Sequence, residues 1–222
     1  MKAMILAAGR GLRLSPLTDS LPKPLVPVLG KPVIEYHIES LARAGCTELV
    51  INVSYLADQL VDYLGDGCRY GVSIQYSLEA QALETGGGLK KALSLLGDEP
   101  FIAVNADILT DYPFERLPST LSGVAHWVMI DTPDYLPGDF ACVDGFLSLE
   151  KTQDQPLLTF SGIAVYSPDF IAQCSGERFG IVAPLRAAIE GGSRVSVERY
   201  TGQWFDMGSL SQLQIAERNF KI

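Results

Sequence analysis

The residues best suited to chemistry lie in a glycine-containing loop near the start of the 222-residue chain. An apolar run over residues 2–8 leads directly into Gly9 and Gly11, and Arg13 and Lys23 follow. Glycine has no Cβ, so backbone N–H groups here can approach phosphate oxygens closely. Arginine adds a forked cation and lysine a point charge, and both attract polyanions. The loop is therefore predicted to bind a phosphorylated ligand, although a Gly-x-Gly pair alone also suits a plain tight turn.

The charge of this segment is opposite to that of the whole chain. The formal net charge is -9, which argues against nucleic acid or an acidic membrane as a partner. Residues 9–31 nevertheless carry Arg10, Arg13, Lys23 and Lys31 against Asp19 alone. A small anionic ligand is predicted, with a solvated basic face as the open alternative. The dinucleotide-binding fingerprint and the P-loop are excluded, because the third glycine and the Gly-Lys-Ser/Thr run that they require are missing.

Two aspartates further along stand in contexts that suit a ligand site. Asp107 follows an apolar run over residues 101–104, and Asp206 lies in the run Trp-Phe-Asp-Met-Gly over residues 204–208. A carboxylate at the C-terminal end of a strand lies where open α/β sheets bind ligands. Taken singly, either aspartate also suits the capping of a turn.

The elements that must position these residues alternate along the first half of the chain. Apolar strands are predicted at residues 2–8, 49–53, 72–76 and 101–104. Helices are predicted from Pro32 and from a cap at Ser54, and the stretch 85–96 is predicted to start with three glycines and then turn helical. This order predicts a parallel sheet with helices on both faces.

The second half is predicted to be partly antiparallel. Asp144-Gly145 indicates a two-residue hairpin, residues 158–166 and 194–198 read as strands, and Ser209 with Gln212 indicates a capping box before a last helix. We expect one domain over residues 1–222, whose second half adds a partly antiparallel substrate lobe.

The spacing of the residues across the whole N-terminal segment is more specific evidence of function than its two glycines alone. Residues 9–18 read G-x-G-x-R-x-x-P-x-T, and Pro-Lys follows at residues 22–23. This pattern resembles the signature of the sugar-phosphate nucleotidyltransferases. The resemblance implies a Rossmann-like, mixed but mainly parallel sheet of the nucleotidyltransferase type. It also implies Mg²⁺-dependent transfer between a nucleoside triphosphate and a sugar 1-phosphate. The nucleotide-binding part would then be at about residues 1–110 and the sugar-binding part at about 111–222.

The same resemblance implies roles for individual residues. Asp107 and Asp206 would bind Mg²⁺, whose preference for oxygen ligands they satisfy, and with Arg13 and Lys23 they would form the catalytic set. Nucleotide contacts are expected from Ala8, Gly9, Gly11, Leu12, Arg13, Lys23, Glu79, Gly86 and Gly87. Sugar contacts are expected from Asn105, Asp139, Glu150, Lys151 and Gly162.

Some of these positions leave alternatives open. Glu79 occupies a place where relatives often carry a base-reading Gln, and it also suits a surface acid at a loop. Glu150-Lys151 is otherwise an exposed ion pair, and Thr152 stands where relatives often have Pro. Ala106 stands where relatives usually have Gly.

Among family members, the chain resembles most the short uridylyltransferases that act on N-acetylmuramate 1-phosphate. The likeness implies UTP and that sugar as substrates, UDP-N-acetylmuramate and pyrophosphate as products, and a role in peptidoglycan recycling. Another sugar 1-phosphate (glucose, mannose or heptose), phosphocholine with CTP, and a catalytically silent nucleotide sensor remain as alternatives.

The remaining expectations concern the setting of the protein. The four cysteines are far apart, and no run approaches the roughly 18 apolar residues of a membrane span. With no leader-like start, we expect a cytoplasmic protein with reduced thiols and no membrane partner. The end shortly after Gly208 implies no C-terminal β-helix and a monomer or weak dimer.

Overall fold

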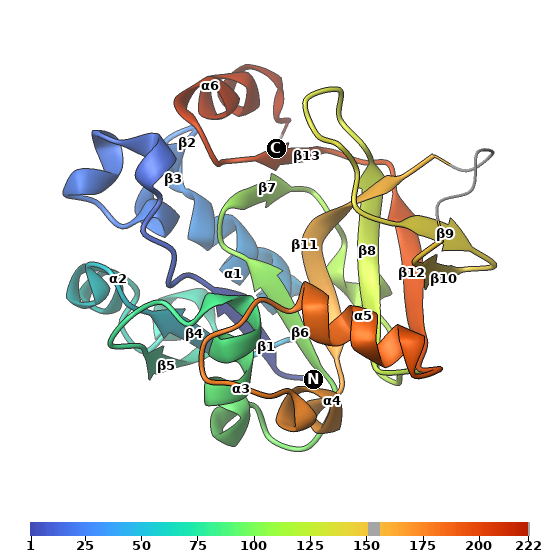
Figure 1. Cartoon of the computed structure of the whole chain (residues 1–222). Helices are drawn as coiled ribbons and strands as arrows, with labels where there is room; N and C mark the ends of the chain where they lie inside the picture. Colours follow the sequence, from blue (N-terminus) through green and yellow to red (C-terminus); the bar gives the residue numbers. More distant parts are fainter. Residues whose placement is uncertain (151–155, 222) are drawn as a thin grey trace.

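The computed structural model describes residues 1–150 and 156–221. A sheet of nine strands runs through the molecule in the order β5-β4-β1-β6-β11-β8-β12-β10-β9 (Figure 1). Its first four strands are parallel to one another: β1 (Ala3–Leu6), β4 (Glu48–Val53), β5 (Ser73–Leu78) and β6 (Phe101–Asn105). Their C-terminal ends therefore meet at one edge, where an open α/β sheet binds ligands.

The second half of the chain extends this sheet and adds the antiparallel pairs. β11 (Leu158–Tyr166) runs antiparallel to β6 and to β8 (Ala125–Asp131), and β12 (Val195–Tyr200) is parallel to β8. β9 (Ala141–Val143) and β10 (Phe146–Ser148) form the predicted hairpin at the far edge. Its two turn residues, Asp144 and Gly145, have φ values of 50° and 80°, the backbone that a tight two-residue turn requires.

Helices cover both faces of the sheet, as predicted. They are α1 (Val33–Arg43), α2 (Ala57–Leu64), α3 (Glu84–Leu96), α4 (Pro168–Gln173), α5 (Val182–Glu190) and α6 (Leu210–Asn219). No helix in the described ranges is long and apolar enough to cross a bilayer.

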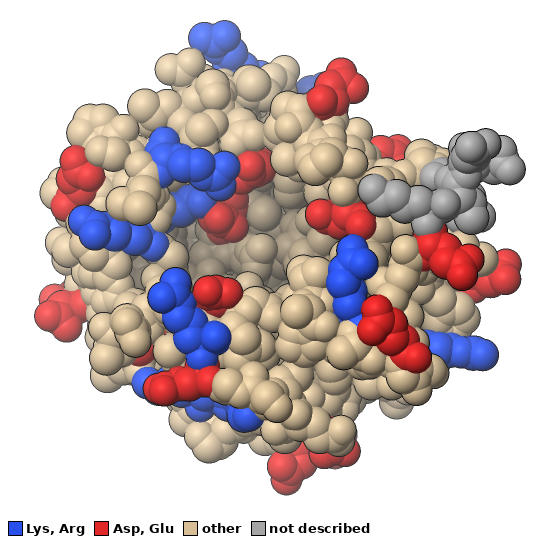
Figure 2. Space-filling view, in the orientation of Figure 1, with Lys and Arg blue, Asp and Glu red and all other residues tan. Residues whose placement is uncertain are grey.

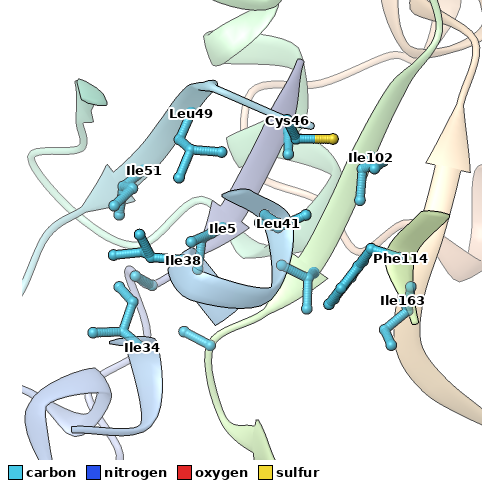
Figure 3. Close-up of a cluster of buried hydrophobic side chains, with 14 of the residues drawn as sticks. Ile5, Ile34, Ile38, Leu41, Cys46, Leu49, Ile51, Ile102, Phe114 and Ile163 are labelled. Atoms are coloured by element: carbon cyan, nitrogen blue, oxygen red, sulfur yellow. The ribbon is translucent and has the colours of Figure 1, made fainter. Parts of the chain in front are cut away.

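Alternation along the central strands gives one cluster of buried side chains on each face of the sheet. Ile5 of β1 packs with Ile38 and Leu41 of α1 on one face, as Figure 3 shows. Its neighbour Met4 packs with Leu89 of α3 on the other. Successive side chains of a strand point to opposite faces, so each central strand contributes to both clusters. Burial of each such side chain contributes about 1.5–3 kcal/mol.

A two-stranded ribbon lies beside the C-terminal ends of the central strands. β7 (Ile108–Thr110) pairs antiparallel with β13 (Trp204–Asp206), and Asp206 is opposite Ile108. The N–H of Met207 also donates to the carbonyl of Asp107 at 2.8 Å. This ribbon brings together two segments that are about a hundred positions apart in the sequence.

The start of α6 agrees with the prediction, whereas the starts of α2 and α3 differ from it. Ser209 caps α6 as expected, and its hydroxyl accepts the N–H of Gln212. Ser54 does not cap α2. The helix begins after Leu56, and the backbone of Leu56 is in the left-handed conformation. The three glycines at residues 86–88 lie inside α3 instead of preceding it, because their missing side chains are needed for close packing, described below.

Candidate active site

A cavity of about 210 Å³ opens at the C-terminal ends of β1, β4 and β6. Figure 2 shows this face hollowed at its centre, with Lys and Arg side chains along one edge of the hollow and Asp and Glu close to them. Its lining comes from five parts of the sequence: Leu6 to Gly9, Lys23 with Pro24, Asn52, the segment with Glu79, Ala82, Glu84 and Thr85, and Asn105 to Asp107.

The glycine loop is shaped around Lys23. Gly11 has a φ of 70°, and a Cβ built on it would lie 3.0 Å from the Cβ of Lys23 and 3.2 Å from Thr18. The Thr18 hydroxyl donates to the Gly11 carbonyl at 2.8 Å, which fixes the loop on this lysine. Glycine is thus required at residue 11 both for its backbone conformation and for the close approach of Lys23.

Lys23 and Asp107 form an ion pair at the mouth of the cavity. The Lys23 Nζ donates to Oδ2 of Asp107 at 2.6 Å. The lysine side chain is only 10% exposed, whereas that of Asp107 is 39% exposed. The buried Lys23 cation is therefore held in a fixed position, while the more exposed Asp107 carboxylate remains open to a ligand.

Asp206 faces this pair from the ribbon. Burial raises the pKa of the Asp206 carboxyl above its usual value, and the negative charge of Asp107 raises it further, while Lys23 and Arg13 lower it. A Cβ on Gly208 would lie 2.7 Å from a terminal nitrogen of Arg13 and 2.8 Å from Oδ1 of Asp206. The structure thus brings together all four residues that the sequence predicted as catalytic.

The two aspartates fit a divalent cation. They are hard oxygen donors, and the charge of Asp107 acts on Asp206 together with the opposite charges of Lys23 and Arg13. Within the described part of the chain, no group of three or more His, Cys, Asp or Glu residues could hold a metal ion. A cation here would take its other ligands from water and substrate phosphates, which is a common way of binding Mg²⁺.

At the other end of the cavity, Glu79 is buried and does not lie on the surface. The residue is only 5% exposed. Oε1 accepts a hydrogen bond from the Asn52 amide at 2.8 Å, and Oε2 accepts the N–H of Leu83 at 2.9 Å. Asn52 was missed by sequence reasoning, although a lone amide at the end of an apolar strand was a usable signal.

Gly86 and Gly87 lie outside the cavity lining, on the far side of the first turn of α3. A Cβ on Gly86 would lie 2.2 Å from the Phe179 ring, and Gly87 donates its N–H to the Phe179 carbonyl at 3.1 Å. These glycines let α3 pack against the segment at 177–180. Their neighbours Glu84 and Thr85 line the cavity instead, and Glu84 has the strained φ of 63°.

Asn105 and Gly162, both predicted as sugar contacts, lie in contact with each other. Gly162 has a φ of 87° in a bulge of β11, and a Cβ there would lie 2.9 Å from Nδ2 of Asn105. The Trp204 indole donates to the Ser161 carbonyl at 2.7 Å and so holds the bulge in place. Trp204 is a second residue that the sequence reasoning did not assign to the site.

The other expected contacts are less closely gathered. Asp139 accepts the N–H of Phe160 at 2.8 Å, so it anchors the chain beside the bulge. Glu150 is exposed just after β10, and Lys151 lies outside the described residues. Ala8 and Gly9 line the cavity, whereas Leu12 points to solvent.

Neither histidine is placed for proton transfer. His37 is buried in α1 and donates from Nε2 to the Ile108 carbonyl at 2.8 Å, and burial lowers its pKa to about 4. His126 lies in β8 against the hydroxyl of Ser196, and burial lowers its pKa as well. Both are neutral packing residues, and His37 supports the turn that carries Asp107.

Known proteins resemble this chain over its whole length. The model of the nucleotidyl transferase family matches residues 2–125. An N-acetylmuramate alpha-1-phosphate uridylyltransferase from Neisseria meningitidis is 44% identical over 98% of this chain and 97% of its own. A UTP–glucose-1-phosphate uridylyltransferase from Synechocystis is 30% identical over 95% of this chain and 61% of its own.

The fold also matches solved structures. HddC from Yersinia pseudotuberculosis, crystallised with GMP-PN, superposes with a TM-score of 0.81 at 22% identity, over 99% of both chains. At that identity the match bears on the fold alone. The family model and the Neisseria relative lead to one conclusion: the chain belongs to the nucleotidyl transferase family, among the enzymes that act on sugar 1-phosphates.

Proposed function

We propose that this enzyme transfers UMP from UTP to N-acetylmuramate 1-phosphate, giving UDP-N-acetylmuramate and pyrophosphate in peptidoglycan recycling. The observation that carries the proposal is the convergence of Arg13, Lys23, Asp107 and Asp206 beside a glycine loop at one cavity. The choice of substrates is supported by the Neisseria relative, which is named for this sugar and a uridylyl group.

The reaction joins two polyanions. An oxygen of the sugar phosphate attacks the α-phosphorus of UTP and forms the new P–O bond. The bond from that phosphorus to the bridging oxygen breaks, and pyrophosphate leaves with the electron pair. Because the nucleophile is already an anion near neutral pH, no general base is needed, and the two buried histidines are not required. Catalysis is then a matter of positioning and of neutralising charge.

The residues of the cavity divide these tasks. Lys23, fixed by its 2.6 Å contact with Asp107, presents a cation to the α-phosphate. Arg13 and the backbone of residues 9–13 hold the departing pyrophosphate. Mg²⁺ bound by Asp107 and Asp206 would supply Lewis-acid neutralisation of the reacting phosphates.

The sugar and base are held at opposite ends. Glu150 and Lys151 are assigned to the sugar hydroxyls and sugar phosphate, with Asn105, Asp139 and Gly162 beside them. Glu79 is assigned to the uracil, whose N3–H its carboxylate can accept. Gly86 and Gly87 are assigned to the nucleotide, and their packing against the segment at 177–180 also positions Glu84 and Thr85 at the cavity.

The wider setting follows from the same properties of the chain. We propose a cytoplasmic enzyme, a monomer or weak dimer, whose partners are small phosphorylated substrates. The net charge of -9 disfavours binding to nucleic acid or to an anionic membrane.

A second candidate function is uridylyl transfer to glucose 1-phosphate. The Synechocystis relative favours it, since that protein is named for UTP and glucose 1-phosphate and matches 95% of this chain. It shares the mechanism and differs in the sugar alone.

Pyrophosphate release from UTP and Mg²⁺, measured over a panel of sugar 1-phosphates and then with other nucleotides, tests the proposal. N-acetylmuramate 1-phosphate with UTP should be fastest by a wide margin, and the Asp107→Asn variant should be inactive. Fastest turnover with glucose 1-phosphate would replace the proposal by the second candidate. Absence of release with every pair would favour a nucleotide sensor and contradict both.

A further inference from the structure

Asn52 is a buried amide that connects the two ends of the nucleotide cavity. It lies near the end of β4, opposite Leu6 of β1, and is only 3% exposed. Its Oδ1 accepts the N–H of Ala7 at 2.7 Å, and its Nδ2 donates to Oε1 of Glu79 at 2.8 Å. Ala7 is the residue at which β1 passes into the glycine loop. One side chain therefore holds both the start of the phosphate loop and a carboxylate at the base end.

The direction of these hydrogen bonds is fixed by chemistry. A backbone N–H can only donate, so Asn52 must present its oxygen to Ala7 and its NH₂ group to Glu79. Glu79 then receives a donor on each oxygen, the amide of Asn52 on Oε1 and the N–H of Leu83 on Oε2. Reversing the amide would place two donors against each other at Ala7 and leave Glu79 Oε1 facing an oxygen.

Helix α3 closes the remaining space around the pair. A Cβ on Gly88 would lie 2.8 Å from Nδ2 of Asn52 and 2.9 Å from Oε1 of Glu79. Such contacts are too short for real Cβ atoms, so glycine lets the helix pack directly on this hydrogen bond. The pair cannot swing toward α3, and the carboxylate is held beside the cavity that it lines.

We propose that Asn52 is a positioning residue that holds Glu79 as an acceptor-only group and so makes the cavity discriminate among nucleobases. The inference rests on the proposed function. Each carboxylate oxygen keeps a second lone pair, which can accept the N3–H of uracil. Cytosine carries a lone pair at N3 and meets repulsion at the same place, and no donor at residue 79 can relieve it.

An exchange of the two side chains tests this separately from folding. In the double variant Asn52→Asp/Glu79→Gln, all three hydrogen bonds are preserved, and only the one between residues 52 and 79 reverses its direction. Ala7 donates to the Asp oxygen, the Gln amide donates to the other Asp oxygen, and Leu83 donates to the Gln oxygen. The Gln amide then has a free N–H for cytosine. The single variant Asn52→Asp instead sets two carboxylates against each other.

We expect the double variant to melt within about 3 °C of the wild type, a difference of roughly 1 kcal/mol for a chain of this size. Its ratio of kcat/KM for UTP to that for CTP should fall at least about tenfold, or 1.4 kcal/mol of discrimination. The single variant should melt lower and lose turnover. A double variant that folds normally and keeps the wild-type ratio would overturn the proposal, since the network would then be structural alone.

Gly88→Ala provides a second test that removes or replaces no polar group. Alanine favours a helix over glycine, so failure to fold is not expected from the backbone. Its Cβ should displace the Asn52–Glu79 pair, raise KM for UTP several-fold and lower the UTP to CTP ratio, with KM for the sugar unchanged. Ser94→Ala, on the exposed side of the same helix, is the matched control and should match the wild type.

Failure of the inference and failure of the proposed function give different results. If the enzyme does not use UTP, the wild type itself shows no preference for UTP over CTP. If only the inference fails, the wild type prefers UTP and both Gly88→Ala and the double variant retain that preference.

Discussion

Gly11 combines a left-handed backbone with direct contact to the catalytic lysine. Its φ is 70°, and an added Cβ would lie 3.0 Å and 3.1 Å from the Cβ and Cδ of Lys23. In Gly11→Ala, the left-handed conformation should cost about 1–2 kcal/mol. For a chain of this length that corresponds to a fall in Tm of about 2–8 °C. The crowding should also push Lys23 away from its position 2.6 Å from Asp107. Since a 1 Å misplacement in an active site can cost about 100-fold in rate, kcat should fall by about 10- to 100-fold.

Gly30→Ala is the matched control. Gly30 has a similar φ of 79°, but no heavy atom among the described residues lies within 4 Å of a Cβ built there. It should therefore lose as much thermal stability as Gly11→Ala and keep its turnover. The assays are melting by circular dichroism and steady-state pyrophosphate release. Wild-type turnover in Gly11→Ala, or an equal loss of turnover in Gly30→Ala, would refute the reasoning.

Three further substitutions follow from the same geometry. Lys23→Ala should remain folded by circular dichroism and lose at least about 100-fold in kcat, as expected for loss of a fixed group that stabilises charge; turnover within a fewfold of wild type would remove Lys23 from the mechanism. Trp204→Phe deletes the donor to the Ser161 carbonyl, and a buried carbonyl left unpaired costs about 1 kcal/mol or more. The KM for the sugar 1-phosphate should therefore rise about fivefold, with the KM for UTP unchanged. Equal changes in both KM values would argue against a role of Trp204 at the sugar end. Ser209→Ala removes the cap of α6 and should lower Tm by about 2–4 °C with no effect on kcat, because this cap lies outside the cavity; a lower kcat at full stability would contradict that.

The sequence was most informative where the chemistry is local. The strand, glycine loop and basic residues up to Lys23 predicted a phosphate site, and the hairpin at Asp144 was readable from two residues. Contacts between distant segments are harder to predict. The Asp107 and Asp206 pair was inferred from resemblance, because the pairing of β7 with β13 that brings them together has no local signal.

Burial explains most of what was missed. The strand β8 is buried on all but its last residue, so it lacks the alternation of polar and apolar residues that marks a half-exposed strand. Glu79 reads as a surface acid until Asn52 and Leu83 are seen to satisfy its oxygens. The packing of Gly86 against Phe179 could not be predicted either, because the two residues are distant in the sequence.

The central claim is most directly tested by one competition reaction. The purified enzyme is given Mg²⁺ with equal concentrations of UTP, CTP, GTP and dTTP, and of the 1-phosphates of N-acetylmuramate, glucose and mannose. The sugar nucleotides formed are then identified by mass. UDP-N-acetylmuramate should be the dominant product in the initial phase. Dominance of any other sugar nucleotide, or formation of none, would contradict the account.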